Sequence, residues 1–419
     1  MSEIRPLVVE DLERAVDIFN NAYPAYGADS PEARERMIKG LTRRIREDKQ
    51  MVFHGLFRDG EMQAVMRLHD YQMNLFGKKT LVGGGGALAV DLCHKHEHAA
   101  LDFMRFFFDH YREKQSPLAI LWPFRPDFYA RMGAGEGPRT DFFKIHTKSL
   151  PHGCGKEKIR FLKKEDLPAL VAFYNRYAAK THGMIEDELM NREISFERQK
   201  SDRYIGYFEN GEMQGYAIFR FVKDNPNNPL DNHIQVNEWL YDSPAALAGL
   251  TAFFRSQEDQ IGHILLPTPD RDFHLMLDDP RNDSNNVHPQ VYQECCISTV
   301  GIMYRVLDTA GMFQVLAHRN FGGETLRVRF NVADNFIETN NRPVTIQFNN
   351  GTPEVVENVA EAEVELSINM PEFSSLIIGA VRLKKLVMYS RATVSDPARL
   401  DQLDRLLAAE TRPICLTQF

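Results

Sequence analysis

The sequence predicts an α+β protein: two tandem, related domains with mixed sheets, followed by a third α+β domain. The first observation behind this prediction is a repeat, in which residues 55–63 return as 206–214. Three further blocks follow the same order: 4–12 with 159–167, 90–101 with 236–247, and 119–123 with 263–267. Four blocks in one order indicate a duplicated domain rather than chance. The second observation is a change of pattern after about residue 290, where the repeat stops and alternating strands begin.

These observations divide the chain into three parts. We expect a first copy at residues 1–150, a second copy at 151–290 and a third domain at 291–419. The segment 278–286 is polar and rich in turn-forming residues, so it is typical of a solvated loop or linker at the end of the second copy.

The elements of the first copy follow from residue patterning. Asp59-Gly60 between two apolar runs is a strong hairpin signal, and apolar residues recur at helical spacing after Glu10-Asp11. We expect strands at 4–8, 51–57, 63–68, 81–90 and 118–122, and helices starting near 12, over 97–111 and over 127–132. The second copy should repeat this order from residue 156 to about 280.

The third domain shows strict alternation of apolar and polar residues. Residues 326–330, 344–348 and 364–368 are typical of half-buried antiparallel strands, with a turn at 349–351. Pro371 opens one helix, and leucines at helical spacing between 400 and 407 indicate another.

Composition sets limits on location and partners. The 419 residues carry a net charge of −8 with a pI near 6.0, which disfavours nucleic acid and mildly favours a cationic small molecule. The five cysteines are scattered and odd in number, as expected in a reducing cytoplasm. No apolar run is long enough for a bilayer span, and residues 1–5 show no signal segment. We therefore predict a cytoplasmic protein without membrane or nucleic-acid partners.

A candidate anion site lies between the strand ending at Val90 and the helix beginning near Glu97. The free N–H groups of a helix start suit a pyrophosphate, and Lys95 adds positive charge. The corresponding segment of the second copy, 237–244, has two carboxylates, no basic residue and Pro244, which lacks an N–H. Only the first copy should bind phosphate.

With this layout the chain resembles the GNAT acetyltransferases, and more closely their enhanced-intracellular-survival (Eis) type, which has two tandem GNAT folds and a sterol-carrier-protein-like domain. The GNAT loop pattern Arg/Gln-x-x-Gly-x-Gly/Ala places Lys95 first, His98 at the first glycine and Ala100 at the last small residue. The resemblance implies acetyl-CoA contacts along the strand end, the helix start and the end of the next strand. The implied residues are Leu88, Ala89, Val90, Lys95, His96, Glu97, His98, Ala99, Ala100, Leu101, Phe124 and Arg125.

A second family signature, Tyr-x-x-x-Gly-x-Gly, is present from Tyr129 to Gly135. The resemblance makes Tyr129 the general acid that protonates the departing CoA thiolate. The second copy has His274 where the first has Tyr129, so this acid is missing there. Taken alone, Tyr129 also fits a half-buried amphipathic tyrosine on a helix face.

The third signature is the tail. Residues 413–419 carry no charged side chain and end in Phe419. In Eis-type enzymes the C-terminal carboxylate, often on phenylalanine, is the general base, so the resemblance implies that Phe419 reaches the active site.

The implied reaction is acetyl transfer from acetyl-CoA to primary amines of a cationic acceptor, aminoglycoside-like or polyamine. The resemblance implies no metal and no further cofactor, and it implies a homo-oligomer, namely a hexamer.

Three further interpretations of the sequence concern the whole protein, the loop histidines and the glycine run. Both copies can be inactive in an acyl-CoA- or lipid-binding carrier protein. His94-Lys95-His96-Glu97-His98 can be a metal cluster, if alternate histidines share a strand face. The run Gly83 to Gly86 is no P-loop, and it can admit a close ligand or strand.

Overall fold

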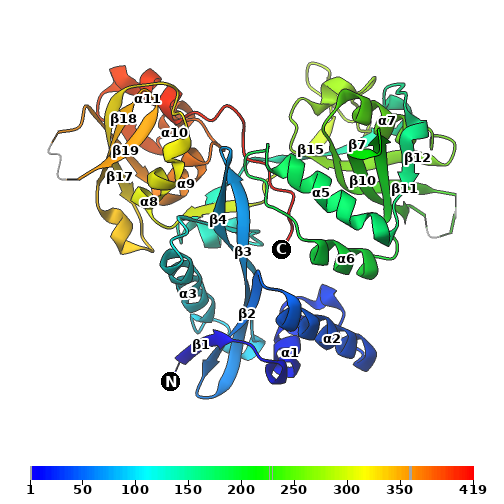
Figure 1. The fold of residues 1–419 in the computed structure, drawn as a ribbon, viewed down its shortest axis with the longest axis horizontal. Coiled ribbons are helices and arrows are strands. Elements are labelled where there is room, and N and C mark those ends of the chain that lie inside the picture. Colours follow the sequence, from blue (N-terminus) through cyan, green and yellow to red (C-terminus); the bar gives the residue numbers. More distant parts are fainter. Residues whose placement is uncertain (1, 226, 229, 358–360) are drawn as a thin grey trace. The chain divides into compact units, whose positions relative to one another are not determined.

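The computed structural model describes residues 2–225, 227–228, 230–357 and 361–419. It consists of two compact units: Met1–Gly137 together with Ile302–Phe419, and Pro138–Gly301 (Figure 1). Both units combine helices with mixed sheets, in agreement with the predicted α+β class. Within the described residues, no helix combines the length and apolar content needed to cross a membrane.

The first unit contains a seven-stranded sheet in the order β1-β2-β3-β4-β5-β16-β6. All neighbouring strands are antiparallel except β4 and β5, which are parallel. The strands are β1 (Ser2–Pro6), β2 (Met51–Arg58), β3 (Glu61–Leu75), β4 (Lys78–Val90), β5 (Leu118–Leu121), β6 (Gly135–Glu136) and β16 (Met303–Val306). The helices that belong to this part are α1 (Leu12–Ala22), α2 (Pro31–Glu47), α3 (Ala99–Glu113) and α4 (Pro126–Ala130).

The predicted hairpin joins β2 and β3. Asp59 and Gly60 both have positive φ, 50° and 85°, as a type I′ turn requires. Asn210 and Gly211 adopt nearly the same angles, 51° and 84°, between the corresponding strands of the second unit. The repeated sequence therefore produces the same turn twice.

Helices α1 and α3 cover opposite faces of the first sheet (Figure 1). On one face Phe103 and Phe107 of α3 pack with Met66, and on the other Phe19 of α1 packs with Val65. Adjacent residues of β3 therefore pack in different hydrophobic cores, because successive side chains of a strand point to opposite faces of the sheet.

The glycine run in β4 allows bulky groups to approach both faces of the sheet. A Cβ on Gly83 would collide with the ring of Tyr111, and a Cβ on Gly85 would lie 2.9 Å from Phe107. On the other face, a Cβ on Gly84 would collide with the ring of Tyr71. As expected, other groups approach this glycine run closely. In this structure those groups are aromatic rings of the chain itself.

The third domain follows β16 in the same unit. Its five-stranded sheet has the order β19-β18-β17-β20-β21, in which only β17 and β20 are parallel. The strands are β17 (Leu326–Ala333), β18 (Val344–Asn349), β19 (Thr352–Val356), β20 (Val364–Asn369) and β21 (Ala392–Val394). The helices are α8 (Thr309–Val315), α9 (Met370–Ile377), α10 (Leu383–Met388) and α11 (Leu400–Leu407). Buried phenylalanines 313, 330, 348 and 373 form its centre.

The second unit repeats the architecture. Its sheet has the order β15-β7-β12-β11-β10-β9-β8, with β11 and β12 as the parallel pair. The strands are β7 (Thr140–His146), β8 (Ile159–Phe161), β9 (Arg203–Glu209), β10 (Glu212–Lys223), β11 (Asn232–Tyr241), β12 (Ile261–Thr268) and β15 (Cys296–Thr299). The helices are α5 (Leu167–Ala178), α6 (Leu189–Arg198) and α7 (Pro244–Arg255), and a small hairpin pairs β13 (Val287–His288) with β14 (Tyr292–Gln293). Residues 278–286, expected to be a loop, contain neither helix nor strand.

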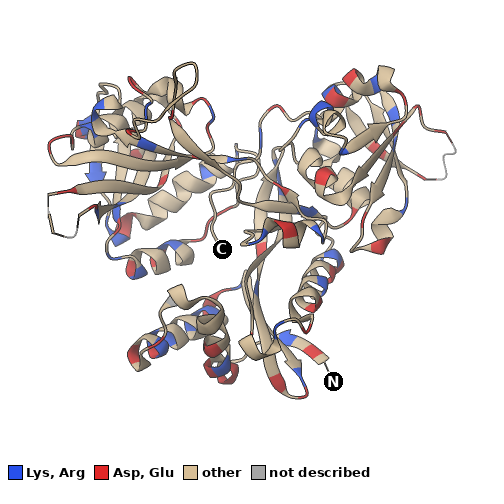
Figure 2. Cartoon of the chain, turned by 180° about the vertical axis from the view of Figure 1, so that it is seen from behind, with Lys and Arg blue, Asp and Glu red and all other residues tan. Residues whose placement is uncertain are grey.

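Two segments join sheets other than those we expected. We placed residues 140–146 with the first copy, but β7 pairs with β12 and β15 in the second sheet. We placed residues 303–306 with the third domain, but β16 pairs with β5 and β6 in the first sheet. The recognisable repeat ends at residues 123 and 267, so the sequence holds no register information for these closing strands. Charged side chains concentrate on helices and loops, whereas the strands are largely uncharged (Figure 2).

Candidate active site

The site begins where β4 and β5 separate. The two strands pair only from Gly83 with Ala119 to Gly85 with Leu121, whereas β4 continues to Val90 along β3. The β3–β4 register shifts after Val65, and Ala87 takes a φ of 50°. This bulge turns the end of β4 away from β5 and leaves the backbone edge of β4 facing an opening.

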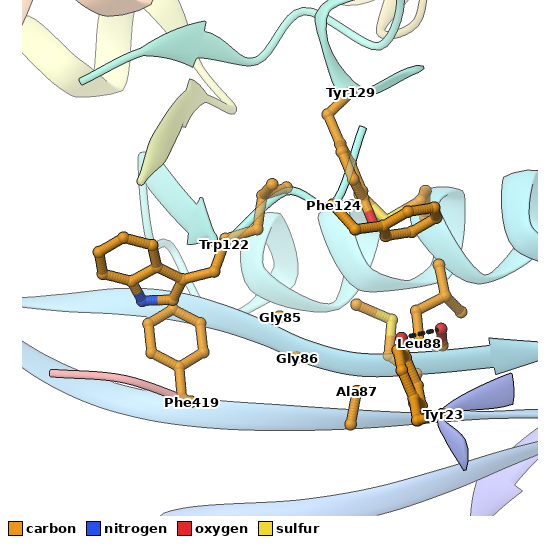
Figure 3. Close-up of a pocket in the computed structure, with 12 residues that line it drawn as sticks. Tyr23, Gly85, Gly86, Ala87, Leu88, Trp122, Phe124, Tyr129 and Phe419 are labelled. Atoms are coloured by element: carbon orange, nitrogen blue, oxygen red, sulfur yellow. Dashed lines mark hydrogen bonds between the residues drawn. The ribbon is translucent and has the colours of Figure 1, made fainter. Parts of the chain in front are cut away.

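A cavity of about 170 Å³ occupies this opening (Figure 3). Its walls come from β3, β4, β5, α3, α4, the segment between β5 and α4, the residue after α1 and the C-terminal tail. The lining residues are Tyr23, Met66, Gly85, Gly86, Ala87, Leu88, Met104, Leu121, Trp122, Phe124, Tyr129 and Phe419. The predicted residues Leu88, Phe124, Tyr129 and Phe419 therefore surround one space.

Tyr129 lies on α4 and is only 5% exposed. Its ring is edge-on to those of Phe124 and Phe128, with centroids 6.1 and 5.1 Å away. Burial, together with the neighbouring Tyr23, raises the pKa of the Tyr129 phenol. The phenol therefore keeps its proton at neutral pH and faces the cavity as a donor (Figure 3).

Tyr23 is a cavity residue that the sequence reasoning missed. It follows α1, and its hydroxyl donates to the carbonyl oxygen of Leu88 over 2.6 Å. This bond connects α1 to the bulged end of β4. A tyrosine after a helix has no distinctive sequence signal, since its role depends on the bulge in a strand far along the chain.

The C-terminal tail is fixed against the first sheet. Trp122 Nε1 donates to the carbonyl oxygen of Thr417 over 3.0 Å. The Phe419 ring packs against Tyr71 and His69 of β3, with centroids 5.0 and 5.5 Å apart. Figure 3 shows Trp122 and Phe419 in the same part of the pocket.

The terminal carboxyl lies beside Gly86. A Cβ built on Gly86 would be 3.1 Å from the Phe419 carbonyl carbon and 3.3 Å from Arg67 Nη2. The glycine thus makes room for the chain end, and a guanidinium lies close to the same point. Such a cation stabilises a carboxylate.

The third domain supports the segment that carries Tyr129. A Cβ on Gly133 would lie 2.7 Å from the guanidinium of Arg305, and a Cβ on Gly135 would collide with the backbone of α9. Arg305 is fully buried, donates to the Met132 carbonyl oxygen at 2.7 Å and pairs with Asp334 at 2.7 Å. The glycines of the Tyr129 motif therefore admit Arg305 of β16 and the backbone of α9 in the third domain.

The loop after β4 ends at a helix start without a side-chain cap. His98, the N-cap of α3, has a φ of 64°, and His96 has 69°. Both histidines thus adopt the backbone conformation that favours glycine. Arg58, which sequence reasoning missed, donates to the Glu97 carbonyl oxygen at 3.0 Å and to Asp102 at 2.8 Å. The α3 amide groups remain available to an anion.

The other predicted cofactor residues are not among those that line this cavity. Lys95, His96, Glu97 and His98 are exposed on the loop, and Ala100 and Leu101 are half-buried in α3. Ala89 is buried in the core that includes α1. Ala99 is buried in the core that includes α3, and Val90 packs against that core. Arg125 is exposed and pairs with Asp127 at 2.6 Å.

The loop histidines do not form the alternating strand face on which the metal alternative depended. Leu92–His94 is a 3-10 turn, and His96 and His98 have positive φ. His94 Nδ1 lies 3.1 Å from Glu97 Oε2. Among the described residues, no three-ligand group occurs in this loop.

The second unit fills and caps the equivalent region. Of residues 237–244, expected to be a loop, most continue β11, so only Asp242 and Ser243 separate it from α7. Ser243 Oγ accepts from the Ala246 N–H at 3.1 Å, and Pro244 has none to donate. Trp239 packs on Phe254 and Phe273, with centroids 6.0 and 6.2 Å away.

Comparisons with protein families agree with this architecture. Residues 3–137 and 179–306 each match an acetyltransferase (GNAT) domain, and residues 313–416 match a sterol carrier protein domain. The chain is therefore a GNAT acetyltransferase. Enzymes of this kind take the transferred group from an acyl-CoA. No curated protein matches the chain.

Solved structures show the same fold over the whole length of the chain. A GCN5-related N-acetyltransferase from Anabaena variabilis has a TM-score of 0.80 at 15% identity, with 100% of both chains covered. A probable N-acyltransferase from Enterococcus faecalis has a TM-score of 0.78 at 16% identity, and Eis1 from Mycobacterium abscessus 0.76 at 16%. Both also cover 100% of each chain. At these identities the likeness concerns the fold alone.

Proposed function

We propose that this GNAT acetyltransferase is of the Eis type and transfers acetyl from acetyl-CoA to a primary amine of a cationic acceptor, aminoglycoside-like or polyamine. The first copy, residues 1–150, carries the chemistry, and the second, 151–290, is degenerate. The observation that carries the proposal is that Tyr129 and Phe419, far apart in sequence, line one cavity.

Acetyl-CoA lies along the open edge of β4 in this proposal. Backbone groups of Leu88, Ala89 and Val90 face its thioester and pantetheine, next to Phe124 and Arg125. Its pyrophosphate binds at the start of α3, where the helix has no side-chain cap. The groups around it there are Lys95, His96, Glu97, His98, Ala99, Ala100 and Leu101.

The terminal carboxylate acts as the general base and Tyr129 as the general acid. The Phe419 carboxylate takes a proton from the acceptor ammonium, and the free amine attacks the thioester carbonyl. Collapse of the tetrahedral intermediate breaks the C–S bond. As charge develops on sulfur, the Tyr129 hydroxyl donates its proton, and free CoA thiol leaves. The nitrogen of the new amide loses its second proton, which restores the Tyr129 phenol. Backbone N–H groups of β4 stabilise the oxyanion.

The cavity suits one ammonium group rather than a whole polycation. Among its described lining residues none is Asp or Glu, so the terminal carboxylate provides the negative charge. Tyr23, Trp122 and Phe124 add aromatic faces that attract a cation. The rest of a polycationic acceptor then binds outside this cavity.

The test is acetyl transfer by the full chain. Purified protein is mixed with acetyl-CoA and a panel of polyamines and aminoglycosides, with CoA thiol release and product mass as readouts. We expect thiol release that requires the amine, with an acetylated product. Saturable acetyl-CoA binding without turnover on any amine would instead favour the carrier alternative, which the sterol carrier protein domain keeps open. Light scattering tests the proposed homo-oligomer.

A further inference from the structure

Three metal-ligating side chains meet on the second sheet, away from the groups used above. Asp224 directly follows β10, His233 lies near the start of β11, and His263 lies near the start of β12. These strands are neighbours in the sheet (Figure 1). The β11–β12 register shifts just before Ile234 pairs with Ile264, and the preceding residues, His233 and His263, lie with their rings stacked.

The three side chains are already close enough to share a ligand. His233 Nδ1 lies 2.7 Å from Asp224 Oδ1, and His263 Nε2 lies 4.0 Å from Asp224 Oδ2. The imidazole rings stack with centroids 5.0 Å apart and planes 12° from parallel. One donor atom from each residue lies within 4.8 Å of the other two.

The three residues differ in exposure. His233 is 9% exposed and His263 is half-buried, while Asp224 is open to solvent. The two imidazoles are therefore at least partly shielded, and the carboxylate keeps the group accessible to an ion.

We propose that Asp224, His233 and His263 bind one divalent transition metal ion, with Zn²⁺ the best match. Two imidazoles and a carboxylate are a common zinc ligand set, whereas Mg²⁺ and Ca²⁺ prefer oxygen ligands alone. Water completes the coordination, because Asp224 leaves the site open to solvent. The ion links β10, β11 and β12 and stabilises the second unit.

The two copies differ at this site. The sequence repeat aligns His263 with Ala119 of β5 in the first copy. His263→Ala therefore gives the second copy the residue that the first copy tolerates at the same place in the same fold. It is the variant of choice, because it removes a ligand with little risk to folding.

The experiment is a Co²⁺ titration of the full chain, stripped of metal and affinity tag. We expect visible d–d absorption that saturates at one equivalent per chain, is displaced by Zn²⁺, and accompanies a rise in melting temperature. His263→Ala and Asp224→Asn should weaken binding by at least about 100-fold. The double variant His96→Asn/His98→Asn, which removes the loop histidines, should bind as the parent does.

Two results would overturn the proposal. One is a parent protein that binds no Co²⁺ or Zn²⁺ at micromolar concentration. The other is unchanged binding in His263→Ala, or binding that disappears only with the loop histidines. A folded His263→Ala protein, verified by circular dichroism without metal, keeps either result interpretable.

Discussion

The two GNAT copies share a hairpin turn, a strand order and a parallel pair of strands. They differ in whether the space at the edge of that pair is open or filled. In the first, β4 ends in small residues beside a cavity, and α3 starts without a side-chain cap. In the second, Trp239 packs on two phenylalanines, and Ser243 caps α7. The fold provides the opening, and a few side chains determine whether it stays open.

A half-buried ionic cluster adds to the filling of the second copy. Arg192 of α6 donates to both carboxylate oxygens of Glu238 at 2.9 Å and also to Asp187. The Tyr216 hydroxyl donates to Glu238 as well. Charged groups that satisfy one another in this way are not available to a ligand.

The strongest test of the comparison is to alter the chain end, which lines the cavity of the first unit. A short Gly-Ser extension after Phe419 removes the carboxylate from the cavity, so kcat should fall by about 100-fold or more. The measurement is acetyl transfer, with circular dichroism to verify folding. The same extension before the first residue is the control. Full activity with the C-terminal extension would exclude the carboxylate as base.

A second, slightly smaller effect is expected for the proposed acid. Tyr129→Phe keeps the ring between Phe124 and Phe128 but removes the proton donor, so kcat should fall by about 100-fold with little change in the acetyl-CoA Kd. His274→Phe is the matched change in the second copy and should leave kcat unchanged. Equal losses from both variants would mean that the second copy takes part in catalysis.

The sequence predicted local features, such as turns and strands, better than it predicted pairing between segments far apart in the chain. The Asp59-Gly60 turn and the strands of the third domain follow from short patterns, and both appear in the structure. Helices α2 and α6 were missed, since neither contains a buried residue and their apolar signal is weak. The partners of β7 and β16 depend on sheet closure, which no local pattern encodes.

The candidate site shows the same limit. Leu88, Phe124, Tyr129 and Phe419 were named from motifs and line the cavity. Tyr23 and Trp122 line it too, but each was invisible in the sequence because its partner, Leu88 or Thr417, is distant along the chain. The glycines at 133 and 135 belong to the Tyr129 signature, and the contacts that they allow, with Arg305 and α9, could not be read from it.

A third test concerns the fit of the tail. In Gly86→Ala the new Cβ would lie 3.1 Å from the Phe419 carbonyl carbon, so the carboxyl must shift. We expect kcat to fall by roughly 10-fold, since small displacements of catalytic groups are costly. Gly262→Ala in β12 is the control, because no atom lies within 4 Å of its Cβ. Unchanged kcat in Gly86→Ala would show that the tail position is not critical.

The smallest effects should come from the starts of α3 and α7. Substitutions at these two positions should change the melting temperature in opposite directions. His98→Gly relieves a positive φ that costs a non-glycine residue about 1 kcal/mol, so the melting temperature of the first unit should rise. Ser243→Ala removes a cap worth about 1 kcal/mol, so the second unit should melt earlier. Acetyl-CoA affinity, measured by calorimetry, should survive in both variants, because the proposed anion site consists of α3 backbone N–H groups that neither change removes. Weaker binding in His98→Gly alone would instead assign the imidazole a direct contact with phosphate. The first copy would then differ from the second by a side-chain donor as well as by an uncapped helix.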